Sequence, residues 1–182
     1  MNDPIASLRR GEPVVLPTDT VYGLCCEATT RASTERMYAL KGRNLSQPSA
    51  LLAATVDDLV AAVPELDASR IVTGAFTLIL PNPGRRFPWI CGATPDAIGV
   101  RVPDLPDAAA AVVRALGAVV ATSANLHGEP APRRIADLDP ALSGLAHVDA
   151  GELPGTPSTV ISLLGAEPVV LRRGAGELSS AS

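Results

Sequence analysis

The sequence predicts an α/β protein, in which a sheet carries helices on its faces. Short apolar runs that end at proline or glycine alternate along the chain with longer stretches of helix-forming residues. Such interleaving is typical of α/β domains. The length of 182 residues suits one domain, residues 1–182, and a hydrophobic fraction of 47% provides a substantial core. The small, polar tail from about residue 175 is expected to fray.

The first two elements surround a polar segment. Residues 13–16 form a short apolar run that Pro17 closes, and this pattern predicts a strand that ends in a turn. Residues 33–40 predict a helix, because the apolar residues Met37 and Leu40 are spaced by three and share one helical face.

The middle of the chain alternates strands and a helix. Residues 50–54 predict a second buried strand. The sequence Thr-Val-Asp-Asp at residues 55–58 resembles a capping box with Asp in place of Glu, and it predicts a helix that runs to about residue 63. Residues 76–80 and 97–102 are apolar runs that each end at a proline, so both predict strands.

The clearest helix is expected at residues 104–116. Pro106 lies near its first turn, its body is rich in Ala, Val and Leu, and Gly117 provides a stop signal. A strand is predicted directly afterwards, at residues 118–122. The last predicted elements are the two strands of a hairpin, residues 158–164 and 168–171.

Composition excludes several classes of protein. The net charge of −4 argues against binding that depends on bulk nucleic-acid electrostatics, although a local basic cleft stays compatible with it. Cys25, Cys26 and Cys91 form neither a disulfide framework nor a zinc-binding spacing, so we interpret them as buried apolar residues in a reducing compartment. The sequence has no signal-peptide core and no apolar stretch that approaches the ~20 residues of a membrane span. We therefore expect a soluble, cytoplasmic protein.

Common catalytic motifs are missing from the chain. It has no Gly-x-x-x-x-Gly-Lys-Ser/Thr loop, no Gly-x-Gly-x-x-Gly after the first strand and no Gly-x-Ser-x-Gly. The two histidines, His127 and His147, are far apart and lack a cysteine at ligand spacing, so we expect no protein-bound metal. The remaining chemical groups are cations, hydroxyls and an amide. This set fits the positioning and electrostatic stabilisation of an anionic reaction.

Lys41 is the only lysine, whereas the other fourteen basic residues are arginines. Lysine is a compact point charge and arginine a planar fork, so Lys41 and Arg43 around a glycine predict an anion-binding pair. A chance surface lysine is the alternative. As an active-site cation, Lys41 is expected to be reachable by solvent.

Three further polar clusters lie near strand ends, where ligands gather in open α/β sheets. They are residues 17–23, 122–125 and 155–160. Turn chemistry also explains the first cluster, and a helix N-cap also explains the second. Arg101 and Arg172 lie in or after apolar runs and could place fixed cations at a sheet edge.

These clusters, in this order, resemble the TsaC/YrdC family of threonylcarbamoyl-AMP synthases. The matching segments are PTDTVYGL at 17–24, KGR at 41–43, RVP at 101–103, TSAN at 122–125, STV at 158–160, and Arg172 before Gly174. The resemblance is to the short form, and it implies a twisted sheet flanked by helices around a large cationic cavity. It also implies an enzyme that makes L-threonylcarbamoyladenylate and pyrophosphate from L-threonine, bicarbonate and ATP.

The resemblance further implies roles for particular residues. Threonine would be bound by Thr20, Arg101 and Ser158. ATP would be bound by Arg43, Gln47, Ser123 and Arg172. The catalytic polar group would be Lys41, Arg43, Ser123 and Asn125. Mg²⁺ would bridge the ATP phosphates with few protein ligands, and the product would pass to a threonylcarbamoyl-transferase complex that acts on tRNA.

Departures from the family pattern keep two alternatives open. Gln47 replaces a usual lysine, and His127 replaces a usual serine after the Ser-Ala-Asn segment. One alternative is a carbamoyl-adenylate enzyme with a different acceptor. The other is a double-stranded RNA-binding module without this activity, for which a steep salt dependence of RNA affinity would be diagnostic.

Overall fold

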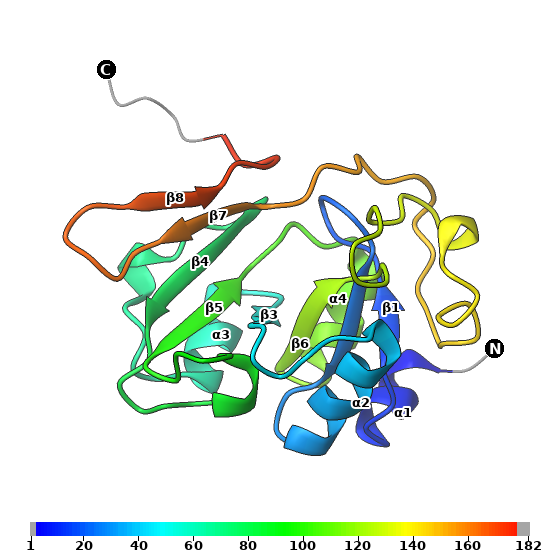
Figure 1. Ribbon diagram of the computed structural model, residues 1–182, viewed down its shortest axis with the longest axis horizontal. Helices are drawn as coiled ribbons and strands as arrows, with labels where there is room; N and C mark the ends of the chain where they lie inside the picture. The colour runs from blue at the N-terminus through cyan, green and yellow to red at the C-terminus, as the bar shows by residue number, and fades with distance from the viewer. Residues whose placement is uncertain (1–2, 178–182) are drawn as a thin grey trace.

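The computed structural model describes residues 3–177, which contain one eight-stranded mixed sheet (Figure 1). In spatial order it runs β1-β2-β6-β3-β5-β4-β7-β8. The β3–β5 and β4–β7 pairs are parallel, and the other pairs are antiparallel. The strands are β1 (Val14–Leu16), β2 (Gly23–Glu27), β3 (Ala50–Ala53), β4 (Phe76–Pro81), β5 (Ala97–Arg101), β6 (Ala118–Ser123), β7 (Thr159–Ser162) and β8 (Val169–Arg172).

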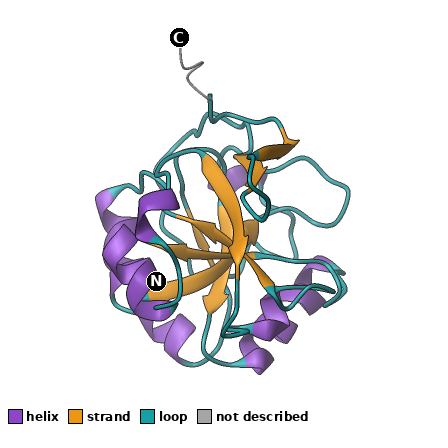
Figure 2. Ribbon diagram, turned by 90° about the vertical axis from the view of Figure 1, so that its left-hand side faces the viewer, coloured by secondary structure: helices purple, strands orange, loops and turns teal. Residues whose placement is uncertain are grey.

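Helices cover both faces of this sheet, which confirms the predicted fold class (Figure 2). The α-helices are α1 (Pro4–Arg9), α2 (Arg31–Lys41), α3 (Val56–Ala62) and α4 (Asp107–Arg114). Helices α2 and α3 pack in the larger hydrophobic cluster, and α1 and α4 pack in a smaller one on the other face. Three short 3₁₀ helices complete the list: η1 (Ala68–Arg70), η2 (Pro88–Ile90) and η3 (Ile135–Asp137).

Local sequence signals account for the helix boundaries near the site. Thr55 Oγ1 accepts a hydrogen bond from the Asp58 backbone N–H at 3.1 Å, so the predicted N-cap of α3 is confirmed. Helix α2 ends at Gly42, whose φ of 62° is left-handed and strongly favours glycine. This turn ends the helix just after Lys41 and begins the loop that carries Arg43.

One α-helix, one strand and the three 3₁₀ helices are not predicted from the sequence, and one α-helix is predicted to begin too early. Neither α1 nor β2 was predicted, because one is only six residues long and the other begins inside a polar segment. Helix α4 begins at Asp107, not at residue 104. Pro106 is its N-cap residue and disfavours helical backbone at Leu105, the residue before it.

The two edges of the sheet differ. The segment 146–148 covers the outer edge of β1: Val15 N–H donates to the Ala146 carbonyl at 2.9 Å, and Val148 N–H donates to the Val15 carbonyl at 3.0 Å. At the other edge, no strand within residues 3–177 pairs with the outer side of β8. The covered edge holds β1 and the polar segment after it in a fixed position.

The chain beyond β8 returns to the sheet. The Ala175 backbone N–H donates to the Pro157 carbonyl at 2.8 Å, and the Gly176 carbonyl accepts from Thr159 Oγ1 at 2.7 Å. The rest of the tail that was expected to fray, residues 178–182, lies outside the described residues.

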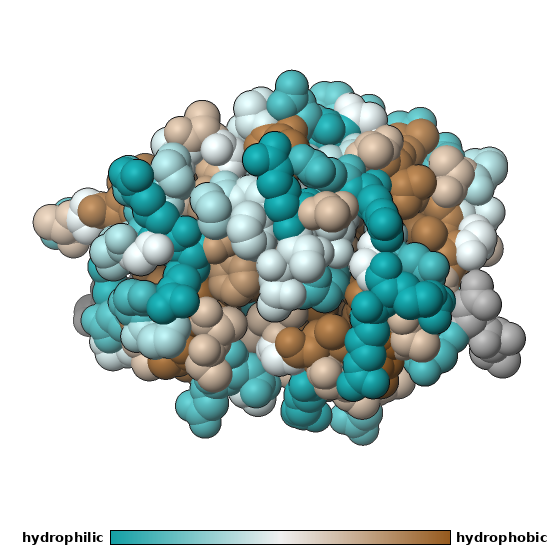
Figure 3. Space-filling model, turned by 90° about the horizontal axis from the view of Figure 1, so that it is seen from below, coloured by the Kyte–Doolittle hydropathy of each residue, from teal (hydrophilic) through white to brown (hydrophobic). Residues whose placement is uncertain are grey.

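The surface shows no broad apolar layer on the side seen from below, where hydrophobic side chains form separate groups among hydrophilic ones (Figure 3). Within residues 3–177, no helix combines the length and apolarity needed to cross a membrane.

Candidate active site

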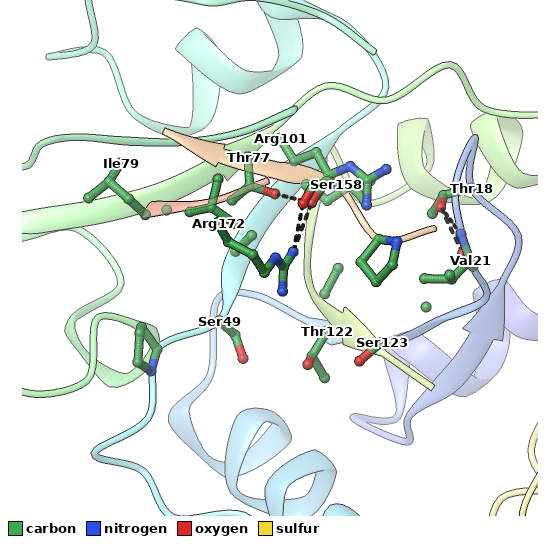
Figure 4. A pocket seen from close by; sticks show the side chains of 18 of the residues that line it. Thr18, Val21, Ser49, Thr77, Ile79, Arg101, Thr122, Ser123, Ser158 and Arg172 are labelled. Carbon is green, nitrogen blue, oxygen red and sulfur yellow. Dashed lines mark hydrogen bonds between the residues drawn. The ribbon is translucent and has the colours of Figure 1, made fainter. Parts of the chain in front are cut away.

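A cavity of about 310 Å³ lies over one face of the sheet (Figure 4). Side chains alternate between the two faces of a strand, so every second residue of the central strands faces this cavity. Gly99 on β5 adds no side chain and leaves room above the sheet. Polar and charged residues that line the cavity are Thr18, Arg43, Ser49, Thr77, Arg101, Thr122, Ser123, Ser158 and Arg172.

Lys41 lies behind one wall of this cavity. Its residue is only 5% exposed, so the expectation of a solvent-reachable lysine is wrong. The last turn of α2 directs the side chain inward, where Nζ donates to the Ser123 carbonyl and to Asn125 Oδ1, the latter at 3.3 Å. Burial, and secondarily the charge of Arg43, lower the pKa of Lys41 to about 8.

Asn125 connects this lysine to the cavity wall. Its Oδ1 accepts from both Lys41 and the Ser123 hydroxyl, and its Nδ2 donates to the Leu126 carbonyl at 3.0 Å. The hydroxyl of Ser123 lines the cavity, whereas Lys41 and Asn125 do not. The structure therefore brings the three residues together as one network, which reaches the cavity through Ser123.

Arg43 faces the cavity from the loop after α2. One terminal nitrogen donates to Thr122 Oγ1 at 2.9 Å, and the other donates to the Pro48 carbonyl at 2.6 Å. The guanidinium also lies over the Tyr38 ring, 5.3 Å from its centroid. Burial lowers the pKa of Arg43, but the ordinary pKa of a guanidinium is so high that Arg43 remains a cation. Its acceptors are all neutral, and none of the acidic groups in residues 3–177 lies within 4.0 Å of it.

The predicted threonine-binding residues Thr20, Arg101 and Ser158 lie on the opposite wall or behind it. Arg101 projects from the end of β5, and its Nη2 donates to Thr20 Oγ1 at 2.7 Å and to the Asp19 carboxylate. Thr20 is fully buried and does not line the cavity itself. The Ser158 hydroxyl lies 2.8 Å from the Thr77 hydroxyl, which gives this wall a paired hydroxyl site.

Arg172 reaches the cavity because of a bulge in β8. Val160 pairs with Arg172 but Ile161 pairs with Val170, so Leu171 is an extra residue between two paired positions. A bulge of this kind shifts the alternation of side chains by one. It places Arg172 on the cavity face beside Val160, where Nη2 donates to the Ser158 carbonyl at 2.8 Å.

The cavity has an excess of positive charge. None of the residues that line it is acidic, and among residues 3–177 neither Lys41, Arg43 nor Arg172 has an acidic group within 4.0 Å. In the same part of the chain, no group of three or more His, Cys, Asp and Glu residues is placed to hold a metal ion. The arrangement suits a polyanion that brings its own cation.

Two residues that the sequence analysis singled out, Gln47 and His127, do not line the cavity. Gln47 contributes its backbone carbonyl to the Tyr38 hydroxyl at 2.9 Å, and its side chain is not part of the lining. His127 is exposed and also lies outside it, although its backbone N–H donates to the Lys41 carbonyl at 3.3 Å.

Several residues of the site were not singled out from the sequence. Asp19 and Thr18 belong to the predicted polar segment 17–23, but composition alone did not separate ligand contacts from turn chemistry. Thr77 had a detectable signal, because it is the polar residue at an alternate position of a predicted strand. Tyr38 had none, since its contact with Arg43 depends on the turn at Gly42.

The family model Sua5_yciO_yrdC, described as telomere recombination, matches residues 6–174. A threonylcarbamoyl-AMP synthase of Bacillus subtilis is 35% identical to this chain. The match covers 95% of this chain and 54% of that protein. One from Chromohalobacter salexigens is 34% identical, over 94% of this chain and 95% of its own length. The solved structure of P. abyssi Sua5 complexed with L-threonine superimposes with a TM-score of 0.83 at 30% identity, over 93% of this chain and 52% of that one.

The relatives therefore fall into two lengths. This chain spans about half of the Bacillus subtilis and P. abyssi proteins, but nearly all of the Chromohalobacter salexigens protein. The matched region includes every element that builds the cavity.

Proposed function

This chain belongs to the Sua5/YciO/YrdC family, and we propose that it forms L-threonylcarbamoyladenylate from L-threonine, bicarbonate and ATP. The observation that supports this most directly is the cavity itself. It combines hydroxyls and one charge-paired arginine, Arg101, with two arginines, Arg43 and Arg172, that have no acidic partner within 4.0 Å among residues 3–177. The first group suits an amino acid, and the second suits a polyphosphate.

The proposed reaction has two steps. The amine of threonine combines with bicarbonate and loses water to give a carbamate. A carbamate oxygen then attacks the α-phosphorus of ATP, and pyrophosphate leaves with the electrons of the broken P–O bond. Two anions must approach each other, so the main contribution of the protein is to neutralise and align them.

The residues of the site take roles in this proposal according to their position. Thr20, Arg101 and Ser158 hold threonine, with Thr20 acting through Arg101 because it is buried behind it. Arg43, Ser123 and Arg172 contact the phosphates from the cavity lining. Lys41 and Asn125 support them from behind. Gln47 stays a predicted ATP contact, and its side chain would have to reach the ligand from outside the lining.

Mg²⁺ belongs to the proposal as part of the nucleotide. The lining residues offer hydroxyls and cations but no carboxylate, which is a poor donor set for a hard divalent ion. We therefore place the ion on the phosphates, where it would neutralise part of their charge, and assign no residue of residues 3–177 as its ligand.

The test is to incubate the protein with ATP, bicarbonate and Mg²⁺, adding threonine in one sample and valine in a matched one. Release of pyrophosphate and the mass of threonylcarbamoyladenylate are measured. Valine lacks the hydroxyl that the serine and threonine groups of the cavity can pair, and such a site can reject the deoxy analogue by about 10⁴-fold. Equal pyrophosphate release with both amino acids would favour a different acceptor.

The wider context is also proposed. The product would be passed to a threonylcarbamoyl-transferase complex that modifies tRNA, and the three buried, unpaired cysteines fit a reducing cytoplasm.

A further inference from the structure

Asp19 joins two segments behind the cavity. One carboxylate oxygen accepts a hydrogen bond from Arg101 Nη2, and the other accepts from the backbone N–H of Asp104 at 3.1 Å. Its side chain is 15% exposed, and Asp19 is not among the residues that line the cavity. Asp19 can therefore influence a ligand in the cavity only through the groups it holds.

Arg101 is held by one nitrogen and is free at another. Nη2 is occupied by Asp19 and by Thr20 Oγ1 at 2.7 Å, whereas Nε is buried and has no partner among the described residues. A buried N–H without an acceptor is rare, and it is most often completed by water or by a ligand. Because Arg101 lines the cavity, an anionic oxygen there can approach the part of its guanidinium that Asp19 and Thr20 leave unoccupied.

Arg172 adds to the need for this partner. Burial is the largest cause that lowers the pKa of Arg101, and the like charge of Arg172, which lines the same cavity, lowers it further. Within residues 3–177, Asp19 is the acidic group within 4.0 Å of Arg101. If the carboxylate were removed, burial and the charge of Arg172 would both favour movement of Arg101 toward solvent.

We propose that Asp19 is a positioning residue, which fixes Arg101 so that its free edge receives the carboxylate of the amino-acid substrate. The identity of that substrate as threonine rests on the proposed function. Removing the charge of Asp19 should weaken binding of an amino acid through its carboxylate, and it should do so only while Arg101 is present.

The experiment is calorimetric titration of L-threonine and of L-threoninamide, which lacks the carboxylate. Four proteins are compared: wild type, Asp19→Asn, Arg101→Ala and the double variant. We expect Asp19→Asn to bind threonine about 10- to 100-fold more weakly, as for loss of a hydrogen bond to a charged group. Threoninamide affinity should change little. In the Arg101→Ala background, Asp19→Asn should cause no further loss.

Asp96→Asn is the matched control, because Asp96 pairs with Arg85 at 2.8 Å on the surface, away from the cavity lining. It should bind threonine as the wild type does. Thermal unfolding is recorded for every variant. If Asp19→Asn does not fold, Asp19→Glu, which keeps the charge but moves the carboxylate, replaces it in the same cycle, with a smaller expected loss of threonine affinity.

The possible failures are distinct. Unchanged threonine affinity in the Asp19 variant, an equal loss for threoninamide, or an additive loss in the Arg101→Ala background would each overturn the role of Asp19. If the wild type neither binds threonine nor releases pyrophosphate with it, the proposed function fails, and the role of Asp19 toward that substrate fails with it.

Discussion

Arg101 on β5 and the other cations at the cavity, Lys41, Arg43 and Arg172, are held in different ways. Arg101 has a carboxylate partner, Asp19, and is largely enclosed. Within residues 3–177, the hydrogen-bond acceptors of Lys41, Arg43 and Arg172 are hydroxyl, amide and carbonyl oxygens, not carboxylates. One region is thus electrically balanced, whereas the other retains its full positive charge.

This difference indicates which ligand each region prefers. A balanced ion pair with a free N–H can orient a carboxylate without attracting a large net charge, which suits a zwitterionic amino acid. Uncompensated cations in a half-enclosed cavity attract a polyanion strongly, because the local dielectric is lower than in water. In the proposed function, the carboxylate of Asp19 would therefore separate recognition of the two substrates.

The largest expected effect concerns Lys41. Lys41→Ala should reduce the rate of adenylate formation by about 10²- to 10³-fold, as for loss of a group that stabilises developing charge. Lys41→Arg should also be impaired, because the larger, planar guanidinium does not fit the buried position of the ammonium beside the Ser123 carbonyl and Asn125 Oδ1. Rates of pyrophosphate release at saturating substrates measure both effects.

Arg31→Ala provides the control for Lys41, since Arg31 lies at the other end of α2 in an exposed pair with Glu35. Lys41→Ala also removes the donor to the Ser123 carbonyl and one of the two donors to Asn125 Oδ1, which costs about 1–3 kcal/mol of stability, offset in part by removal of a buried charge. Full activity in a folded Lys41→Ala protein would exclude Lys41 from the mechanism.

A smaller effect, on the affinity for each substrate, distinguishes the role of Arg101 from that of Arg172. Arg101→Ala should weaken threonine binding about 10- to 100-fold and leave ATP binding nearly unchanged, whereas Arg172→Ala should do the reverse. Direct titration of each ligand is the appropriate measurement, because coupled binding would blur the two KM values.

Arg173→Ala is the matched control for Arg172, because Arg173 is exposed and does not line the cavity. Equal weakening of both ligands in both variants would show that the cavity is not divided between them, even if the reaction is as proposed.

Periodicity predicted most of the fold, because most strands are short apolar runs bounded by proline or glycine. It failed at β2, where the short apolar run of residues 24–26 directly follows a polar segment, and pairing with β6 supplies the missing stabilisation. It also could not give the order of the strands, since β3 lies between β5 and β6, which are distant from it in sequence.

The site was predicted through its motifs, but its organisation was not. The sequence identified Lys41 as chemically unusual, yet its burial depends on the long-range contacts with Ser123 and Asn125. The direction of Arg172 depends on the unpaired Leu171, and a one-residue bulge has no signature in a run of valines and leucines.

The smallest expected effect is the dependence of kcat/KM on pH. This dependence tests the role of the positive charge of Lys41. The pKa of Lys41 is lowered to about 8, from an ordinary value near 10.5. In free enzyme the ammonium is therefore lost as the pH rises through about 8, and kcat/KM should fall by about tenfold per pH unit above it. Stability should change in the opposite direction: the unfolded chain binds the proton more tightly, so the cost of burying the cation is present below pH 8 and is relieved between about pH 8 and 10.5.

Two variants make this argument testable. Lys41→Arg keeps its charge throughout, so its residual kcat/KM should not show the decline above pH 8. Lys41→Met removes the titrating group, so its free energy of unfolding should lack the rise that the wild type shows between about pH 8 and 10.5. If wild type and Lys41→Arg decline together, another group controls the alkaline limb, and the contrast between a balanced arginine and an uncompensated lysine does not govern the rate.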